Sequence, residues 1–165
     1  MDRRLMNKTT ILLGGAAVVF LAAAGWIMSQ NSRAQAIPVP TAPNIQAGQS
    51  LYGEYCASCH GANLEGQPDW RSPGDDGRLP APPHDETGHT WHHPDQLLFK
   101  YTKLGGKAAL ASQGIEFDSG MPGFGEDLSD QDIWNILGFI RSTWPERQRQ
   151  VQVERTKLDS EGEGN

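Results

Sequence analysis

The sequence predicts an all-α protein with few helices and with loops rich in glycine and proline. Apolar residues recur at helical spacing in three separate segments, and no segment alternates apolar and polar residues as a strand does. Glycine and proline supply 19 and 11 of the 165 residues, well above average usage, which favours long irregular loops. This length suffices for one ordinary domain.

The first expected helix begins at Ala47. Its apolar face falls at positions i, i+3, i+4 and i+7, which are Gly48, Leu51, Tyr52 and Tyr55. The helix ends in the segment CASCHG at 56–61. Residues 61–89 then hold ten glycines or prolines among 29 residues, so they are expected to form an irregular loop.

Two more helices follow. Pro94 fits the first turn of the second helix, whose apolar stripe is Leu97, Leu98, Tyr101 and Leu104. Gly105 and Gly106 are expected to end it, before a second glycine-rich loop over 105–128. Ser129 and Asp132 resemble a capping box at the start of the last helix. Its stripe is Ile133, Ile136, Leu137, Ile140 and Trp144, and Pro145 ends it.

The regions outside this body are of two kinds. Residues 1–30 read as a signal or an N-terminal membrane anchor, because a basic stub precedes the 18 uncharged residues 11–28. The small residues of Ala34-Gln35-Ala36 offer a cleavage site, so the body is either anchored by 11–28 or released after Ala36. Residues 31–46 contain three prolines and read as an extended linker, and the polar tail 145–165 is expected to be disordered.

The charge balance limits the classes of partner. The whole chain has 14 basic and 20 acidic residues, and residues 37–165 keep 10 basic and 19 acidic ones, a net charge of −9. An acidic body without a basic run argues against nucleic acid and favours a partner with a basic face.

The chemistry of the chain centres on Cys56-Ala57-Ser58-Cys59-His60. Cys-x-x-Cys-His is the attachment signature of a c-type haem: the two thiols bind two vinyl groups of the porphyrin, and the histidine ligates the iron. A thioredoxin-like pair would need a strand–helix–strand pattern, and a zinc site would need further ligands. A structural disulfide would leave the adjacent histidine without a reason. We expect one covalently bound haem c, with Cys56 and Cys59 as thioether residues and His60 as an axial ligand.

Met121 is the candidate for the second axial ligand. The other three methionines lie in the N-terminal segment, and Met121 sits among glycine and proline in the second loop. A thioether sulfur raises the reduction potential of a haem iron. Four histidines, His84, His89, His92 and His93, could suggest copper or zinc. We expect them instead to be solvated or hydrogen-bonded, one of them to a haem propionate.

Three segments carry a resemblance to a known family. They are GQSLY (48–52) leading into CASCHG (56–61), GMPGF (120–124), and LSDQDIW (128–134) running to IRSTWP (140–145). In this order they make residues 47–144 similar to class I monohaem c-type cytochromes, of the bacterial kind that is exported or membrane-anchored. The resemblance implies the cytochrome c fold, with the first and last helices crossing beside one haem.

The resemblance also implies particular contacts. Gly48 and Tyr52 would meet the last helix at Ile136, Leu137 and Ile140. The carbonyl of Pro82 or Pro83 would accept the N–H of the His60 imidazole, and Trp91 would neighbour a propionate or cover the haem edge.

The expected function is one-electron transfer between redox proteins on the periplasmic side of the bacterial inner membrane, and not catalysis. The donors and acceptors would bind transiently. The alternative is a haem subunit or an enzyme with a labile sixth ligand, acting on peroxide or nitrogen oxides. A gas sensor would need an output domain, for which the tail after Pro145 is too short.

Overall fold

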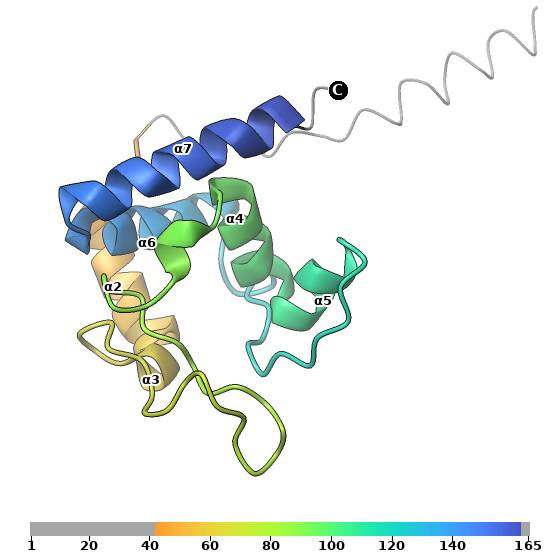
Figure 1. Cartoon of the computed structure of the whole chain (residues 1–165). Helices are drawn as coiled ribbons and strands as arrows, with labels where there is room; N and C mark the ends of the chain where they lie inside the picture. Colours follow the sequence, from red (N-terminus) through yellow and green to blue (C-terminus); the bar gives the residue numbers. More distant parts are fainter. Residues whose placement is uncertain (1–41, 163–165) are drawn as a thin grey trace, which may run out of the picture. The chain divides into compact units, whose positions relative to one another are not determined.

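The computed structural model describes residues 42–162 (Figure 1). The predicted signal or anchor at 1–30 and the linker up to residue 41 lie outside the described residues. Within the described range the elements are helices and a single 3₁₀ turn, without a strand, so the all-α prediction is confirmed. The elements are α2 (Ile45–Tyr55), α3 (Ala57–His60), η1 (Thr90–His92), α4 (Asp95–Leu104), α5 (Gly106–Ala111), α6 (Asp130–Thr143) and α7 (Glu146–Gly162). None of the helices between residues 42 and 162 has the length and apolar character needed to cross a bilayer.

Helix α2 starts two residues before the predicted Ala47, inside the segment expected to be linker. Asn44 is the reason, because its side-chain oxygen accepts a hydrogen bond from Ala47 N at 3.0 Å. A side-chain cap of this kind satisfies one of the backbone donors at the helix start. Helix α2 therefore begins at Ile45, directly after its Asn44 cap.

The first and last predicted helices cross at a glycine, as the family resemblance implied. A Cβ atom on Gly48 would lie 1.9 Å from Asn135 O and 3.1 Å from Ile136 N, so the backbones of α2 and α6 touch. Asn44 N also donates to Asn135 Oδ1 at 2.8 Å. Tyr52, 1 % exposed, packs its ring against Phe139 at 5.5 Å. The crossing thus fixes the direction in which α2 approaches the Cys-x-x-Cys-His segment.

Helix α6 begins as the sequence predicts. Ser129 and Asp132 form the capping box, with Asp132 N donating to Ser129 Oγ and Ser129 N donating to Asp132 Oδ2. The helix ends at Thr143, just before Trp144 and Pro145. Its apolar face supplies a large part of the core, which contains Ile133, Trp134, Ile136, Leu137 and Ile140.

Helix α4 has the predicted bounds, but its buried face differs from the predicted stripe. Phe99 is fully buried and stacks on Trp134 of α6 at 4.7 Å, with Thr102 buried beside it, whereas Leu104 is 50 % exposed. Gly105 ends the helix with φ +84°, a conformation that favours glycine. Gly106 does not end anything. It starts the short helix α5, which lies within the segment predicted to be loop.

The prediction of a disordered tail is wrong for residues 146–162. These residues form α7, in which Gln152 is completely buried. Gln152 Nε2 donates to Asp95 Oδ1 at 2.7 Å, Asp95 pairs with Arg141, and Asp95 N donates to Thr156 Oγ1 at 3.1 Å. The tail is ordered because hydrogen bonds, rather than an apolar stripe, hold α7 against η1 and the start of α4 (Figure 1).

Candidate functional site

The segment Cys56–His60 forms one tight turn at the end of α2. Cys56 N donates to Tyr52 O at 2.9 Å, and the backbone N atoms of Cys59 and His60 donate to Cys56 O at 3.1 and 2.9 Å. Gly61 then ends the short helix α3 with φ +82°. The turn therefore brings both thiols and the imidazole of the predicted motif together.

The two cysteines are free thiols in different surroundings. Cys56 is 8 % exposed and Cys59 is exposed. Burial, and then the neighbouring Cys59, raises the pKa of Cys56 to about 11. A thiol-redox pair instead has a cysteine with a lowered pKa, so the thioredoxin-like alternative receives no support.

His60 is buried and held by one specific contact. Its Nδ1 atom lies 2.8 Å from the carbonyl oxygen of Pro82. The carbonyl can only accept, so Nδ1 carries the proton and donates it, which leaves the lone pair on Nε2 free for a metal. Burial lowers the pKa of His60, and the Pro82 hydrogen bond offsets part of that shift. Of the two prolines that the resemblance suggested, Pro82 makes this contact.

Two glycines let Pro82 and Pro83 come this close. A Cβ atom on Gly66 would lie 2.4 Å from Pro83 N, and Gly66 has φ +69°. A Cβ atom on Gly88 would lie 2.0 Å from Pro83 O. Gly66 N also donates to His60 O at 2.7 Å. The loop after the motif is thus folded back tightly onto His60.

The four histidines between residues 84 and 93 pack mainly against aromatic rings. His84 stacks on His60 with ring centroids 4.0 Å apart, His89 stacks on Trp70 at 5.2 Å and meets His93 edge-on at 5.2 Å, and His92 stacks on Trp91 at 3.6 Å. Across residues 42–162, no group of three or more His, Cys, Asp or Glu side chains is placed to hold a metal ion. Sequence reasoning did not find the contact between His84 and His60, because 24 residues separate them and no local pattern links them.

Met121 lies in a loop that is fastened to the junction of α4 and α5. Gly106 N donates to Met121 O at 3.1 Å, and Met121 N donates to Ser119 Oγ at 3.2 Å. Ser119 Oγ in turn accepts from Tyr101 Oη at 3.0 Å. A Cβ atom on Gly123 would lie 2.6 Å from Leu104 C, so the loop backbone rests directly on the end of α4. Met121 itself is half-buried.

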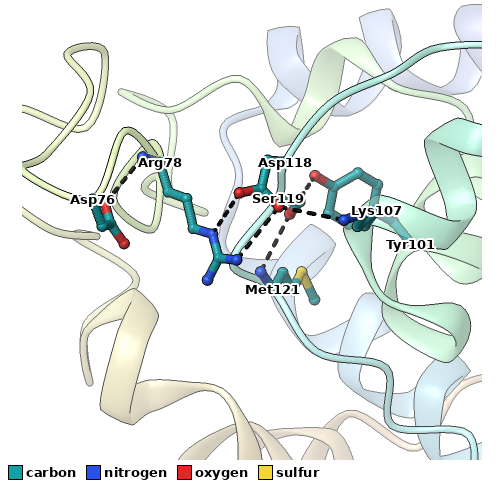
Figure 2. A network of polar contacts seen from close by, with 7 residues as sticks. All are labelled: Asp76, Arg78, Tyr101, Lys107, Asp118, Ser119 and Met121. Atoms are coloured by element: carbon teal, nitrogen blue, oxygen red, sulfur yellow. Dashed lines mark hydrogen bonds and ion pairs between the residues drawn. The ribbon is translucent and has the colours of Figure 1, made fainter.

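An ion pair joins the loop of Pro82 to the loop of Met121 (Figure 2). Arg78 Nε lies 3.0 Å from Asp118 Oδ2, and Lys107 Nζ lies 3.8 Å from Asp118 Oδ1. These side chains are about half or more exposed, so each pair adds little stability. Its relevance is spatial, because Arg78 and Asp118 connect the loop whose Pro82 carbonyl contacts His60 to the loop that contains Met121.

The surroundings fit a haem in two further respects. Trp91 Nε1 is a buried donor without a partner in the described residues, and a propionate carboxylate could accept a hydrogen bond from it. Four large apolar side chains, all 39–50 % exposed, lie in or next to the segments of the sequence that contain Arg78 and Met121. They are Leu79, Leu104, Ile115 and Phe117. Exposed apolar groups of this kind are typical of a site that takes a large apolar ligand.

Comparison with known proteins agrees with this geometry. The family model of cytochrome c matches residues 45–144, which include Cys56, Cys59, His60, Pro82 and Met121. No curated protein and no solved structure shows a significant match to the chain. The matched region covers more than half of the chain and begins and ends at the helices that cross at Gly48. The chain belongs to the cytochrome c family.

Proposed function

We propose that this protein is a one-electron carrier with one covalently bound haem c, ligated by His60 and Met121. Membership of the cytochrome c family supports haem-based electron transfer and implies haem c as the cofactor. The sequence has a single Cys-x-x-Cys-His motif, which supports one haem per chain. The number of haems and the pair of ligands are the parts of this proposal that need experiment.

The observation that carries the proposal is the 2.8 Å contact between His60 Nδ1 and Pro82 O. A metal-ligating histidine characteristically donates its second ring N–H to a carbonyl or carboxylate, which fixes the tautomer and the ring orientation. Here that arrangement occurs at the residue that follows the Cys56–Cys59 pair. It presents Nε2, and not Nδ1, to a metal.

The chain's own residues would divide the work as follows. The thiols of Cys56 and Cys59 would each add across a vinyl group, with the S–H hydrogen passing to the vinyl carbon, and so hold the porphyrin. A bound haem supplies an iron that cycles between the ferric and ferrous states. Pro82 would keep the Nδ1 proton of His60 in place, and Trp91 Nε1 would donate a hydrogen bond to a propionate. The fastened loop presents Met121, whose thioether favours the reduced iron.

We also propose that the body acts on the periplasmic side of the bacterial inner membrane. Residues 11–28 would anchor it if they are retained, and cleavage after Ala36 would release it. Redox proteins with basic faces would be its transient partners, because residues 37–165 carry a net charge of −9. Electron-transfer rates with such a partner should fall as salt rises.

The experiment is expression of the full chain with a c-type haem attachment system, followed by acid-solvent extraction and visible spectra. We expect the haem to stay with the protein, one per chain, and the oxidised protein to show a sulfur-to-iron charge-transfer band. Haem that is extracted from wild-type protein would overturn the covalent attachment. Absence of the band, together with rapid binding of cyanide or carbon monoxide, would favour the enzymatic alternative with a labile sixth ligand.

Membrane fractionation and N-terminal sequencing of the mature protein test the location. A chain in the membrane fraction that retains residues 11–28 indicates an anchor. A soluble periplasmic chain that begins at Ile37 indicates cleavage. Recovery of the haem-loaded chain from the cytoplasm would contradict the proposed location.

A further inference from the structure

We propose that His84 is a positioning residue that fixes the ring plane of His60, and through it the orientation of the axial imidazole. This inference rests on the proposed role of His60 as an iron ligand. The two imidazoles stack with their centroids 4.0 Å apart and their planes 24° from parallel. Parallel contact at this distance covers one face of the His60 ring.

The Pro82 hydrogen bond alone leaves one freedom to the His60 ring. It restrains the distance from Nδ1 to one carbonyl oxygen, which is a single restraint on the two side-chain torsions χ1 and χ2, so the ring can still tilt while the hydrogen bond is kept. A flat group packed against the ring face removes that tilt. Pro82 and His84 therefore act on different coordinates of the same ring, one on its edge and one on its plane.

The His84 side chain and backbone are themselves held by hydrogen bonds, so the His84 ring can restrain the orientation of the His60 ring. His84 Nδ1 lies 2.8 Å from Thr90 Oγ1, and Thr90 is buried. Its backbone N donates to Leu64 O at 2.8 Å, and its carbonyl accepts from Trp144 Nε1 at 2.7 Å. The ring and both backbone polar groups of His84 therefore have hydrogen-bond partners from three different parts of the chain.

One of these partners is conformationally unusual. Leu64 has φ +65°, a backbone region that non-glycine residues rarely adopt. Its carbonyl accepts from both His84 N and Asp85 N. Leu64 is buried, so packing and these two hydrogen bonds maintain the conformation that anchors the His84 backbone.

The plane of an axial imidazole is measurable independently of stability. In a ferric low-spin haem it controls how unpaired spin is distributed over the four pyrrole rings. The order and spread of the four haem-methyl proton resonances therefore report the orientation of the ligand planes. A side chain that merely filled space would affect the unfolding free energy but not this pattern.

The test compares three variants of the haem-loaded full chain with wild type. His84→Leu has similar volume without a planar face, His84→Phe keeps a planar face without the Thr90 contact, and Thr90→Val removes the hydroxyl. Phe99→Leu is the matched control, because it deletes a stacked ring away from His60, 4.7 Å from Trp134 in the core between α4 and α6. Each variant is measured by methyl NMR in the oxidised state, by reduction potential and by chemical unfolding.

We expect His84→Leu to change the order or spread of the methyl resonances and shift the potential, and His84→Phe to restore the wild-type order. Thr90→Val should give a smaller shift in the same direction as His84→Leu. Phe99→Leu should lower stability and leave the methyl order unchanged. If His84→Leu does not retain haem, the methyl patterns of Thr90→Val and His84→Phe test the inference in its place.

Two results would overturn the inference. One is a wild-type pattern of haem-methyl resonances in His84→Leu that has bound haem. If His84→Leu does not bind haem, a wild-type pattern in Thr90→Val has the same meaning. The other is an equal change in Phe99→Leu. Failure of the proposed function has a different signature, because wild-type protein would then lack covalent haem or a His/Met spectrum. The positioning role fails only when wild type has both and the variants show no distinct pattern.

Discussion

The Nδ1 atom of His60 lies 2.8 Å from the carbonyl oxygen of Pro82, which is 22 residues further along the chain. The loop between them returns to the motif because Gly66 and Gly88 leave room for Pro83. The hydrogen bond that defines the candidate site therefore depends on residues that carry no functional group of their own.

Replacement of Gly88 by Ala should disturb this hydrogen bond. The new Cβ would lie 2.0 Å from Pro83 O, so the Pro82–Pro83 segment must move. We expect a loss of about 1–3 kcal/mol in unfolding free energy. We also expect a higher reduction potential, because a weaker hydrogen bond leaves His60 less anionic. Denaturant unfolding and potentiometric titration measure both. Gly74→Ala, whose Cβ has no neighbour nearer than 3.5 Å, is the control, and equal behaviour of the two variants would contradict the prediction.

The helix crossing provides a second matched pair on α2. Gly48→Ala places a Cβ 1.9 Å from Asn135 O and should destabilise the protein by about 3 kcal/mol or prevent folding. Gly53→Ala has no neighbour within 4 Å and should stabilise it by about 0.5–1 kcal/mol. Chemical unfolding of both variants checks the pair. Similar effects from the two would show that helix propensity, and not the crossing, dominates.

Replacement of Met121 by Ala should open the sixth coordination position. We expect loss of the sulfur-to-iron band, a lower reduction potential and binding of carbon monoxide by the reduced protein. Pro122→Ala, a change at an exposed neighbour in the same loop, should retain the band. A Met121→Ala protein with an unchanged spectrum would exclude Met121 as the ligand.

Stability should fall as the solution is acidified from about pH 6.5 to pH 4. Burial, followed by the nearby His89, His92 and Arg155, lowers the pKa of His93 from its ordinary value of 6.5 to about 4. In this window the unfolded chain binds a proton at this position that the folded chain does not, so stability rises with pH. The slope from one such group is up to about 1.4 kcal/mol per pH unit.

His93→Gln should reduce that slope, since it removes the titrating ring. Unfolding free energy measured at several pH values between 4 and 7 provides the comparison. His92→Gln leaves the burial of His93 in place and removes only one of the lesser causes of its shift, so it should reduce the slope much less than His93→Gln does. A wild-type slope in His93→Gln would exclude His93 as its source.

Helix α7 can be tested at its one fully buried residue. Gln152→Leu removes the hydrogen bond from Nε2 to Asp95 and should cost about 1–3 kcal/mol in unfolding free energy. Gln150→Leu, at an exposed site on the same helix, should change stability by less than about 0.5 kcal/mol. The far-ultraviolet spectrum of each folded variant shows whether α7 remains helical. An unchanged unfolding free energy in Gln152→Leu would show that the hydrogen bonds of Gln152 do not contribute to stability.

The parts of the fold that depend on local signals were predictable. The capping box of Ser129 and Asp132, the stop before Pro145 and the Cys56–His60 turn each need only a few adjacent residues. The glycine at position 48 was assigned to the crossing through the family resemblance, and the contact with Asn135 and Ile136 confirms it.

The failures have physical reasons. The tail was predicted to be disordered because the face of α7 that contacts the body is polar, with Gln152 and Thr156 in place of an apolar stripe. Helix α5 was missed because Gly105 and Gly106 look alike in sequence, whereas only Gly105 has a positive φ. The role of His84 depends on two residues 24 positions apart meeting face to face, which periodicity cannot reveal.

The place where the chain enters the body has a mechanical consequence. Pro43 packs against Gly138 of α6, and the eleven residues of α2 then lead to the turn of His60. At about 1.5 Å per residue, α2 is roughly 16 Å long and separates Pro43 from the Cys56–His60 turn by that length. Tension on the N-terminal side would load the α2–α6 pair in shear at Gly48, while the His60–Pro82 contact lies beyond the loaded segment. Force applied upstream of Pro43 would therefore reach the α2–α6 crossing before it reached the His60–Pro82 contact.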